Sequence, residues 1–334
     1  MDSKTVKRLP NKIAIVGTPN CGKTSLFNSL TGLNQRVGNF SGVTVERKSA
    51  TISHKDRELI LIDLPGTNSL YPASEDEIIT CQVLQDPNHP DHPDQVLVIA
   101  DATQLRRGLA LCSQVIDLGF PTLLVINRID LLEEASEKVD FQRLSAKIGI
   151  PILPISVTTK KGLNGLKRML FQDLPKPGRQ VMKLPSGFGP ALKKVQEYLP
   201  GDEPSYLSFQ ILLSPEHFSW IDSQKIGEIQ ELAGIRSETG QLISNELLTR
   251  YDFADEVLKE VMYPADDIQK NISSRIDTIL THRIWGYLVF FAVLILIFQS
   301  IFSWASYPSD AIDAWVEGIK SSLDDRLSAG WGKD

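Results

Sequence analysis

The sequence predicts an α/β protein with a mainly parallel sheet, followed by a small all-α domain and one transmembrane helix. Three observations predict this arrangement. Short aliphatic runs alternate with helix-like stretches over residues 11–175, residues 176–280 lack such runs, and residues 284–304 carry no formal charge. A chain in which strands alternate with helices builds right-handed crossovers and a layered α/β fold.

The aliphatic runs predict strands that are buried on both faces of one sheet. They are Ile13–Val16, Leu59–Ile62, Val96–Ala100, Leu123–Ile126 and Ile152–Ile155. Unbroken runs rich in β-branched residues are typical of parallel strands with helices on both sides. Residues 1–10 are polar and basic, so we expect a tail that is not a secretory signal and an N-terminal part that stays in the cytosol.

Composition excludes several classes of protein. The 334 residues carry a formal net charge of −6, which argues against a protein held on nucleic acid by phosphate neutralisation. The three cysteines, Cys21, Cys81 and Cys112, form no CxxC pair. We therefore expect neither a disulfide scaffold nor a structural zinc site.

Prolines and glycines between residues 175 and 189 predict a linker. Beyond it, segments such as Lys225–Ala233 and Ala254–Val261 carry apolar residues at helical spacing, which predicts several short helices. This helical domain, residues 176–280, contains no catalytic constellation.

The uncharged segment Ile284–Trp304 predicts the transmembrane helix. Its 21 residues would span about 31 Å as a helix, which matches a hydrocarbon core of about 30 Å. The alternative is a buried core helix. Arg283 precedes the segment and acidic residues follow it, which favours a cytosolic N-terminal side. Residues 305–334 predict an amphipathic extracytoplasmic tail.

Residues 17–24, Gly-Thr-Pro-Asn-Cys-Gly-Lys-Thr, follow the first predicted strand and fit the pattern GxxxxGK[ST]. In such a P-loop the backbone amides and the helix N-terminus face phosphates, the lysine reaches the β and γ oxygens, and the threonine hydroxyl binds magnesium. A helix is expected over Ser25–Leu30. The predicted nucleotide-binding residues here are Gly17, Asn20, Cys21, Gly22, Lys23, Thr24 and Ser25.

A second loop, Asp63-Leu-Pro-Gly66, follows the second aliphatic run. Its carboxylate is placed to hold magnesium through water, and the Gly66 amide to contact a γ-phosphate. Thr44, in the glycine-containing loop before it, is placed to bind magnesium when the γ-phosphate is present. We thus predict Thr24, Thr44 and Asp63 as magnesium residues, and Lys23, Thr44 and Gly66 as catalytic residues.

The third motif, Asn127-Arg-Ile-Asp130, is predicted to select the base. A carboxylate at Asp130 accepts hydrogen bonds from both adjacent donors of guanine, whereas adenine presents an acceptor there. Ser156, Val157 and Thr158 are expected to support the base through backbone amides. The three motifs together predict a P-loop GTPase that converts GTP to GDP and phosphate. Thr67 stands where many GTPases carry a water-orienting glutamine, so we expect slow intrinsic turnover.

Two features allow a second interpretation. The segment His89–Asp94 contains two histidines and is interpreted as a solvated loop, with iron binding as the alternative. Cys21 is either a small residue that the phosphate loop requires or a redox-sensitive thiol.

The sequence resembles the FeoB family of ferrous iron transporters over essentially its whole length. The segments that carry the resemblance are Thr18–Asn28, Val37–Glu46, Asp63–Leu70, Ser74–Ile79, Asp101–Thr103 and Arg275–His282. The resemblance implies a cytosolic GTPase domain (residues 11–175), a helical domain that stabilises GDP binding (176–280), and the first helix of a transporter in the inner (plasma) membrane. It also implies that Asn20 helps to hold a potassium ion, which replaces an arginine finger and stimulates turnover.

The expected function is therefore a membrane-tethered GTPase that is coupled to, or regulates, uptake of Fe(II). Expected partners are guanine nucleotide, the membrane, further transporter helices and small Feo accessory proteins; no nucleic acid is expected. The chain is expected to be a fragment, a split gene product or a regulator. The alternatives are a membrane GTPase switch that transports nothing and, with less support, a GTPase that assembles ribosomes or acts on RNA.

Overall fold

The structure is a computed structural model that describes residues 11–32, 36–40, 45–55, 57–134, 137–178, 180–185, 187–199, 204–218, 220–232, 234–235, 237–264, 280, 282, 284–299, 312 and 314–321. The chain divides into two compact units, one that ends at residue 266 and one that begins at residue 267. Each unit is described by itself.

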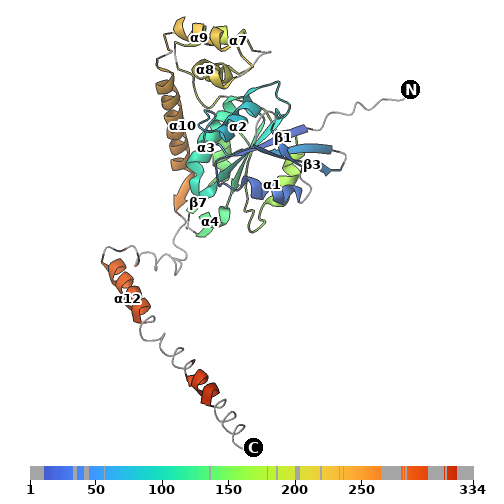
Figure 1. The fold of residues 1–334 in the computed structure, drawn as a ribbon. Coiled ribbons are helices and arrows are strands. Elements are labelled where there is room, and N and C mark those ends of the chain that lie inside the picture. The colour runs from blue at the N-terminus through green and yellow to red at the C-terminus, as the bar shows by residue number, and fades with distance from the viewer. Residues whose placement is uncertain are drawn as a thin grey trace, which may run out of the picture. The chain divides into compact units, whose positions relative to one another are not determined.

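A seven-stranded sheet forms the centre of the first unit (Figure 1). Its strands are β1 (Asn11–Gly17), β2 (Arg36–Asn39), β3 (Glu46–His54), β4 (Arg57–Asp63), β5 (Gln95–Asp101), β6 (Thr122–Asn127) and β8 (Ile152–Pro154). The order across the sheet is β2-β3-β4-β1-β5-β6-β8, and the pairs from β4 to β8 are parallel. The predicted mainly parallel sheet is confirmed.

The antiparallel edge made by β2 and β3 is not predicted from the sequence. β3 pairs with β4 between Lys48–Asp63 and His54–Arg57, and β2 pairs with the first half of β3. β2 is exposed along its length, and β3 is buried only at Ser49 and Ala50. Neither strand therefore shows the aliphatic run that reveals a strand covered on both faces.

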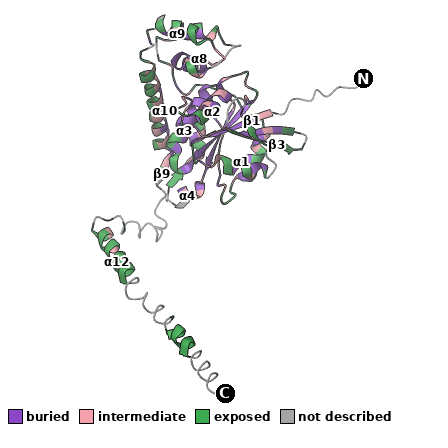
Figure 2. Cartoon of the chain, in the orientation of Figure 1, coloured by how far each residue is buried: buried purple, intermediate pink, exposed green. Residues whose placement is uncertain are grey.

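Helices cover both faces of the sheet, and the buried residues lie between the layers (Figure 2). On β1, Ile13 and Ile15 share one apolar cluster with α1 (Lys23–Thr31) and α6 (Leu163–Leu170). The alternate side of the strand contributes to the cluster of the other face, because successive side chains point to opposite sides. That face carries α2 (Glu75–Gln85), α3 (Leu105–Asp117), α4 (Ile129–Glu134) and α5 (Phe141–Ile148), and a 3₁₀ turn, η1 (Ala102–Gln104), precedes α3.

The helical part of the first unit is built from α7 (Gly189–Gln196), α8 (Ser205–Leu213), α9 (Ser223–Leu232) and α10 (Thr239–Val261), with a 3₁₀ turn, η2 (Pro215–His217), before α9. Helices α7, α8 and α9 contact one another, and α10 runs from α8 along α3 to α5 (Figure 1). The segment predicted as helical from Lys225 lies in α9, although Ala233 is outside the described residues, and Ala254–Val261 lies in α10. α10 has 23 residues and is therefore not one of the short helices expected. The predicted boundary at residue 175 stays a prediction.

After α10 the chain forms a short strand, β9 (Met262–Pro264), which pairs antiparallel with β7 (Glu137–Val139). The expectation that residues 176–280 contain no strand is therefore wrong. A strand of three residues is too short to give the periodic pattern on which that expectation rests.

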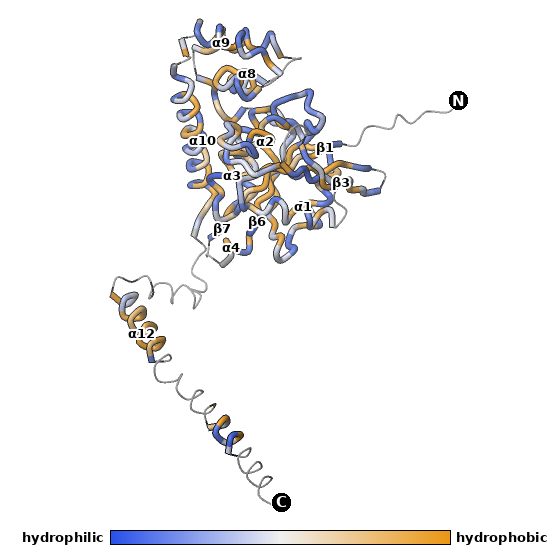
Figure 3. The backbone as a smooth tube through the Cα atoms, in the orientation of Figure 1, coloured by the Kyte–Doolittle hydropathy of each residue, from blue (hydrophilic) through white to orange (hydrophobic). Residues whose placement is uncertain are grey.

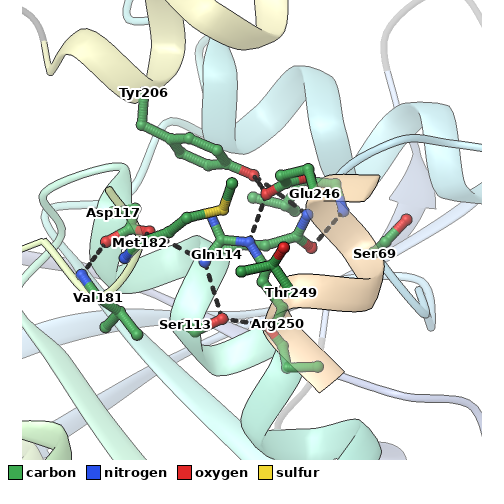
Figure 4. A network of polar contacts seen from close by, with 12 residues as sticks. Ser69, Ser113, Gln114, Asp117, Val181, Met182, Tyr206, Glu246, Thr249 and Arg250 are labelled. Carbon is green, nitrogen blue, oxygen red and sulfur yellow. Dashed lines mark hydrogen bonds and ion pairs between the residues drawn. The ribbon is translucent and has the colours of Figure 1, made fainter. Parts of the chain in front are cut away.

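Arg250 on α10 is fully buried and is held by carboxylates from two helices (Figure 4). Its Nη1 lies 2.9 Å from Asp117 Oδ2 on α3 and donates to Ser113 Oγ at 2.8 Å, and its Nε donates to Glu246. Burial by itself lowers the pKa of Arg250, but interactions with Tyr206, Glu246 and Asp117 outweigh it and raise that pKa. The guanidinium therefore stays charged and joins α10 to α3.

The same network reaches the chain that follows Gly66. The Tyr206 hydroxyl on α8 donates to Glu246 at 2.8 Å and accepts from Gln114 Nε2 on α3 at 3.1 Å. Gln114 Oε1 in turn accepts from the backbone N–H of Leu70 at 2.9 Å. A continuous path of buried hydrogen bonds thus links this segment to α8 and α10 (Figure 4).

In the second unit, α12 (Trp285–Gln299) is apolar over almost its whole length and has no buried residue (Figures 2 and 3). Its 15 residues correspond to about 23 Å, which is shorter than a hydrocarbon core of about 30 Å. Within the described part of the chain, no helix has both the length and the apolarity that crossing a membrane requires. The predicted transmembrane helix over residues 284–304 is therefore not confirmed, and residues 300–304 lie outside the described part. In the predicted tail, 305–334, residues 314–321 form a helix.

Candidate nucleotide-binding site

The predicted phosphate loop connects β1 to α1. Gly17 ends β1 and Lys23 begins α1, and between them Asn20 and Gly22 adopt φ angles of 64° and 97°. A Cβ on Gly17 would lie 2.5 Å from the carbonyl oxygen of Ile99 in β5, so only glycine fits there. The loop leads into the N-terminus of α1, where backbone N–H groups and the helix dipole favour an anion.

Lys23 lies between the two predicted phosphate-binding loops. Its Nζ donates to the carbonyl oxygens of Gly17 and Thr18, at 3.3 and 3.5 Å. A Cβ on Gly66 would come within 3.0 Å of the same nitrogen and within 3.2 Å of Pro19 Cα. A glycine at position 66 thus lets the second loop approach the first closely, and the ammonium group lies where both loops meet.

Asp63 and Thr24 form the oxygen pair predicted for magnesium. Thr24 Oγ1 donates to Asp63 Oδ2 at 3.0 Å. Asp63 is 8% exposed, and its Oδ1 has no hydrogen-bond partner among the described residues. Burial raises the pKa of Asp63, while the Thr24 hydroxyl, Lys23 and Lys48 act in the opposite direction. A hydroxyl beside a carboxylate with an unpartnered oxygen is a donor set of the type that magnesium takes, so these residues fit the ion.

The turn after Gly66 is fixed by contacts that the sequence analysis did not predict. Thr67 is buried and its hydroxyl donates to the carbonyl oxygen of Ser69. Glu77 on α2 accepts from the backbone N–H groups of Asn68 and Ala73, at 3.0 and 2.9 Å. The residue in the place of the usual glutamine therefore uses its hydroxyl within its own turn.

Asn127 connects the predicted phosphate loop to the loop of residues 156–158, which follows the last predicted strand. Its Nδ2 donates to the carbonyl oxygen of Cys21 at 3.0 Å, and its Oδ1 accepts from the Val157 N–H at 3.1 Å. The side chain is 3% exposed. A Cβ on Gly22 would lie 2.4 Å from Asn127 Nδ2, so glycine permits this approach. One amide side chain thus brings two of the predicted motifs together.

Asp130, predicted to select guanine, lies in α4. Its Oδ1 is buried and has no hydrogen-bond partner in the described part of the chain. The Ile129 N–H donates to the carbonyl oxygen of Ile155 at 3.2 Å, so α4 begins beside the loop that contains Ser156. In that loop Ser156 is buried and Thr158 is exposed. An unpartnered carboxylate oxygen here is an acceptor for base donors.

Arg128 and Asp101 form an ion pair in the loop that is predicted to read the base, and sequence reasoning did not predict this pair. Arg128 has a φ angle of 64°, and its Nη1 lies 2.7 Å from Asp101 Oδ2 at the end of β5. A non-glycine residue in this region carries strain that its surroundings must offset. The signal that could have indicated Asp101 is its place at the carboxyl end of a predicted strand, where parallel sheets form their sites.

Thr44 lies outside the described residues. The strands on either side of it, β2 and β3, pair as far as Asn39 and Glu46. Lys48 in β3 pairs with Asp63 in β4. Because these strands are antiparallel, the chain before Lys48 runs toward the carboxyl end of β4. The magnesium role of Thr44 stays a prediction, as does any contact of Ser25, which is exposed on α1.

The histidine-containing loop gives no support for an iron site. Among the described residues, no group of three or more His, Cys, Asp or Glu side chains is placed to hold a metal ion. His89 Nδ1 accepts from the Asp91 N–H at 3.0 Å, and Asp91 is buried and accepts from Arg47 Nε at 2.7 Å. Burial lowers the pKa of His89 and of His92. The loop is a partly buried connection held by Arg47, not the solvated loop expected.

Cys21, Cys81 and Cys112 are free and buried, and burial raises the pKa of each thiol. The thiolate is the reactive form of cysteine. Cys21 therefore fits the interpretation as a small residue of the phosphate loop and not as a redox-sensitive thiol.

The fold and these loops define a nucleotide-binding domain of the P-loop GTPase class. The family described as ferrous iron transport protein B matches residues 11–170, and the cytosolic domain of L. pneumophila FeoB is 30% identical to this chain. The chain belongs to the FeoB family.

The solved structures agree with this assignment. The L. pneumophila domain has a TM-score of 0.62 and covers 76% of this chain and 100% of its own. The cytosolic domain of the T. maritima FeoB iron transporter, in a GDP form, gives 29% identity, a TM-score of 0.62 and the same coverage. The resemblance found in the sequence is therefore confirmed.

Curated relatives extend beyond this chain. The Fe(2+) transporter FeoB of Leptospira biflexa is 32% identical over 95% of the chain, and a protein of Porphyromonas gingivalis that fuses Fe(2+) transport protein A to FeoB is 31% identical over 97%. The chain spans 47% and 40% of the length of these two relatives.

Proposed function

We propose that this chain binds GTP with magnesium and hydrolyses it to GDP and phosphate, as the cytosolic part of a ferrous iron transport protein. The observation that carries the proposal is the buried Asn127 side chain, which joins the phosphate loop to the Val157 loop through contacts of 3.0 and 3.1 Å. The unpartnered carboxylate oxygen of Asp130 lies in the adjoining helix. Related FeoB cytosolic domains solved in a GDP form and in a GMPPNP form support a guanine nucleotide as ligand.

At the phosphate end, the chain would supply one ammonium group, a backbone amide and ligands for magnesium. The Lys23 ammonium group would contact the β and γ oxygens, and the Gly66 amide the γ-phosphate. Thr24, Asp63 and Thr44 would hold magnesium, which when bound neutralises charge on the phosphate oxygens. Lys23 already lies where both loops meet, so little rearrangement is needed to present it.

At the base end, the chain supplies acceptors and a rigid support. Asp130 would accept hydrogen bonds from the ring N1–H and the exocyclic amine of guanine. Asn127 fixes the loop of Ser156, Val157 and Thr158, whose backbone amides would face the base. The ion pair with Asp101 helps to hold Arg128 itself in its strained backbone conformation, two residues before Asp130.

Turnover is proposed to be slow without a further cation, because Thr67 cannot replace a water-orienting glutamine while its hydroxyl is bonded to Ser69. We propose that Asn20, exposed in the phosphate loop, helps to hold potassium beside the phosphates. Equal turnover in sodium chloride and in potassium chloride would contradict this role.

The transport side of the proposal rests on the relatives, which are named as Fe(2+) transporters. We propose that the apolar helix α12 belongs to the membrane-attached part, that the GTPase part is cytoplasmic, and that GTP hydrolysis is coupled to Fe(II) uptake. Further transporter helices and a small Feo accessory protein are proposed partners, since one relative is a fusion with Fe(2+) transport protein A.

The test of the nucleotide proposal is Asp130→Asn. Loss of a charged acceptor for two donors should weaken GTP binding about 100-fold. Binding of xanthosine triphosphate should improve, because its ring carries an acceptor where guanine has the exocyclic amine. Competition against a fluorescent GDP analogue measures both affinities, with Asp252→Asn, an exposed carboxylate of α10, as the control. Unchanged preference for GTP in Asp130→Asn would remove Asp130 from the base site.

A further inference from the structure

One face of the sheet in the first unit is formed by segments that are poor in acidic residues. Residues 3–45 contain no Asp or Glu, and residues 156–178 contain only Asp173. The structure brings these two segments together, because α1 from the first and α6 from the second cover the same face of the sheet. Phe27 of α1 and Leu166 of α6 are buried in one apolar cluster there. In a chain whose formal net charge is −6, this face therefore differs in charge from the rest.

Exposed basic side chains lie on α6 and on the loop before it. Lys160 and Lys161 in the loop, and Lys167 and Arg168 in the last turn of α6, are all exposed. No described carboxylate forms an ion pair with Lys160, Lys167 or Arg168, whereas Asp173 lies 3.9 Å from Nη1 of an arginine in β4. A basic last turn complements the dipole of a helix. That effect accounts for two of these residues but not for the lysines of the loop or for the lack of acidic residues on α1.

The opposite face of the sheet has the opposite character. Glu75 and Asp76 are exposed in the first turn of α2, which covers that face. Asp252 and Glu256 are exposed on α10, which packs against α3 on the same side. The charge of the first unit is thus distributed unevenly, positive on α6 and negative on α2 and α10. A protein with such a distribution is oriented by the field of a charged surface.

Resting on the proposed membrane attachment, we propose that a basic face, made of Lys160, Lys161, Lys167 and Arg168, docks on anionic phospholipids of the membrane to which α12 attaches. Each Lys or Arg near an anionic surface strengthens binding about fivefold. Four such residues hold a free protein only weakly, but attachment through α12 keeps the basic face near the bilayer at a high effective concentration. The acidic residues of the opposite face are repelled by the same lipids, so the contact has one orientation.

The chain favours lipid over RNA as the polyanion that the basic face contacts. RNA approaches from solution, where the net charge of −6 opposes it, and it gains nothing from attachment through α12. Proteins that hold single-stranded RNA also stack its bases on aromatic side chains. Among the described residues, the exposed large apolar side chains include none on α6 or in the loop before it.

The first test follows one residue of this face by fluorescence. Asn164 is exposed on α6, and Asn245 is exposed on α10. Because the three native cysteines are buried, Asn164→Cys and Asn245→Cys each accept a single NBD label in the full chain. The vesicles contain phosphatidylcholine, about 30% phosphatidylglycerol and a lipid with a nitroxide on its headgroup. We expect quenching at position 164 to exceed that at position 245 at least fivefold, and to match it on vesicles without phosphatidylglycerol. Equal quenching at both positions on the anionic vesicles would overturn the proposal.

The second test removes three positive charges from the labelled chain in two different places. The first triple variant carries Lys160→Gln, Lys167→Gln and Arg168→Gln. The control triple variant carries Lys193→Gln, Lys194→Gln and Lys259→Gln, at exposed positions of α7 and α10. The first should weaken docking about 100-fold, so that quenching at position 164 falls to its value on phosphatidylcholine alone, and the control should leave it unchanged. About 0.5 M salt should act like the first variant, because it screens exposed charges. Persistent quenching in the first variant, or its loss in both variants, would overturn the proposal.

Flotation separates the docking from the proposed membrane attachment. Both triple variants should float with phosphatidylcholine vesicles as the unaltered chain does, because α12 is unchanged in them. Failure of the unaltered chain to float with either kind of vesicle would refute the attachment and the docking together. Flotation with anionic vesicles without the additional quenching at position 164 would refute the docking alone. A labelled RNA oligonucleotide that binds the unaltered chain but not the first triple variant would overturn the proposal in favour of nucleic acid.

Discussion

At the scale of single residues, the nucleotide site contains carboxylates that the fold buries and does not fully pair. Asp63 is the clearest case, since burial raises its pKa and its Oδ1 lacks a partner among the described residues. A carboxyl whose pKa is higher in the folded protein than in the unfolded chain lowers the free energy of unfolding once it ionises. Ionised Asp63 therefore lowers the stability of the free protein, as expected for a carboxylate whose role is to bind a cation.

We therefore predict opposite effects of Asp63→Asn on stability and on activity. Without magnesium, the variant should have a higher free energy of unfolding at neutral pH. This advantage should disappear as the pH falls through the raised pKa of Asp63, because the carboxyl of the unaltered protein then becomes protonated. Urea unfolding at several pH values measures this dependence.

Activity should change in the other direction. Loss of the Asp63 carboxylate, which is proposed to hold magnesium through a water molecule, should reduce magnesium-dependent GTP hydrolysis about 10- to 100-fold. Asp173→Asn, at an exposed carboxylate, should change neither property. A variant that is both less stable at neutral pH and fully active would contradict the assignment of Asp63.

The residues of the site differ in how far the sequence predicts them. The spacing of the motifs brings Lys23, Thr24 and Asp63 together, because each motif follows a buried strand and the carboxyl ends of parallel strands meet at one edge. The partnership of Arg128 with Asp101 is not predictable in this way. It depends on a positive φ angle, which residue spacing does not reveal.

At the scale of helices and strands, burial decides what the sequence predicts. The parallel strands are apolar on both faces and are found from their aliphatic runs. Strands β2, β7 and β9 are short, and their residues are mainly exposed or half-buried, so they show no period. The pairing of β7 with β9 joins residues more than 120 positions apart, and no local pattern encodes it.

The buried network around Arg250 leads to a prediction about α10. Arg250→Met removes one member of a group whose carboxylates, on Asp117 and Glu246, remain buried. Removal of one partner from a buried ion pair costs about 3–5 kcal/mol. We expect the free energy of unfolding to fall by about that amount, as measured by urea denaturation followed by circular dichroism.

Lys259→Met provides the matched control, because Lys259 is exposed on the same helix. An exposed substitution of this type should stay within about 0.5 kcal/mol of the unaltered protein. A loss below about 1 kcal/mol in Arg250→Met would show that the network does not join α10 to α3 in the manner described.

At the scale of the whole molecule, the two units differ in surface character. Within the second unit, α12 is apolar along most of its length (Figure 3). Its large apolar side chains, including Phe290, Val293 and Ile297, are exposed. Exposed apolar surface of this kind marks a site of contact with lipid or protein. We proposed attachment to a membrane on this ground and on the names of the relatives.

The membrane proposal predicts that the chain floats with phosphatidylcholine vesicles in a density gradient. Val293→Asp combined with Ile297→Asp should abolish flotation, because each charge within a bilayer costs about 2.5–3.5 kcal/mol. Leu248→Asp, at an exposed apolar residue of α10, should float normally. Flotation of the doubly charged variant would show that α12 does not enter the lipid.

The burial of the three cysteines has a consequence for a protein that works beside its proposed cargo. Cys21, Cys81 and Cys112 are enclosed, and their thiols hold their protons more tightly than free cysteine does. Ferrous iron coordinates thiolates, and oxidants attack them, so burial that disfavours the thiolate makes these three side chains poor metal ligands and poor targets of oxidation. Cys21 is thus protected within the loop between β1 and α1.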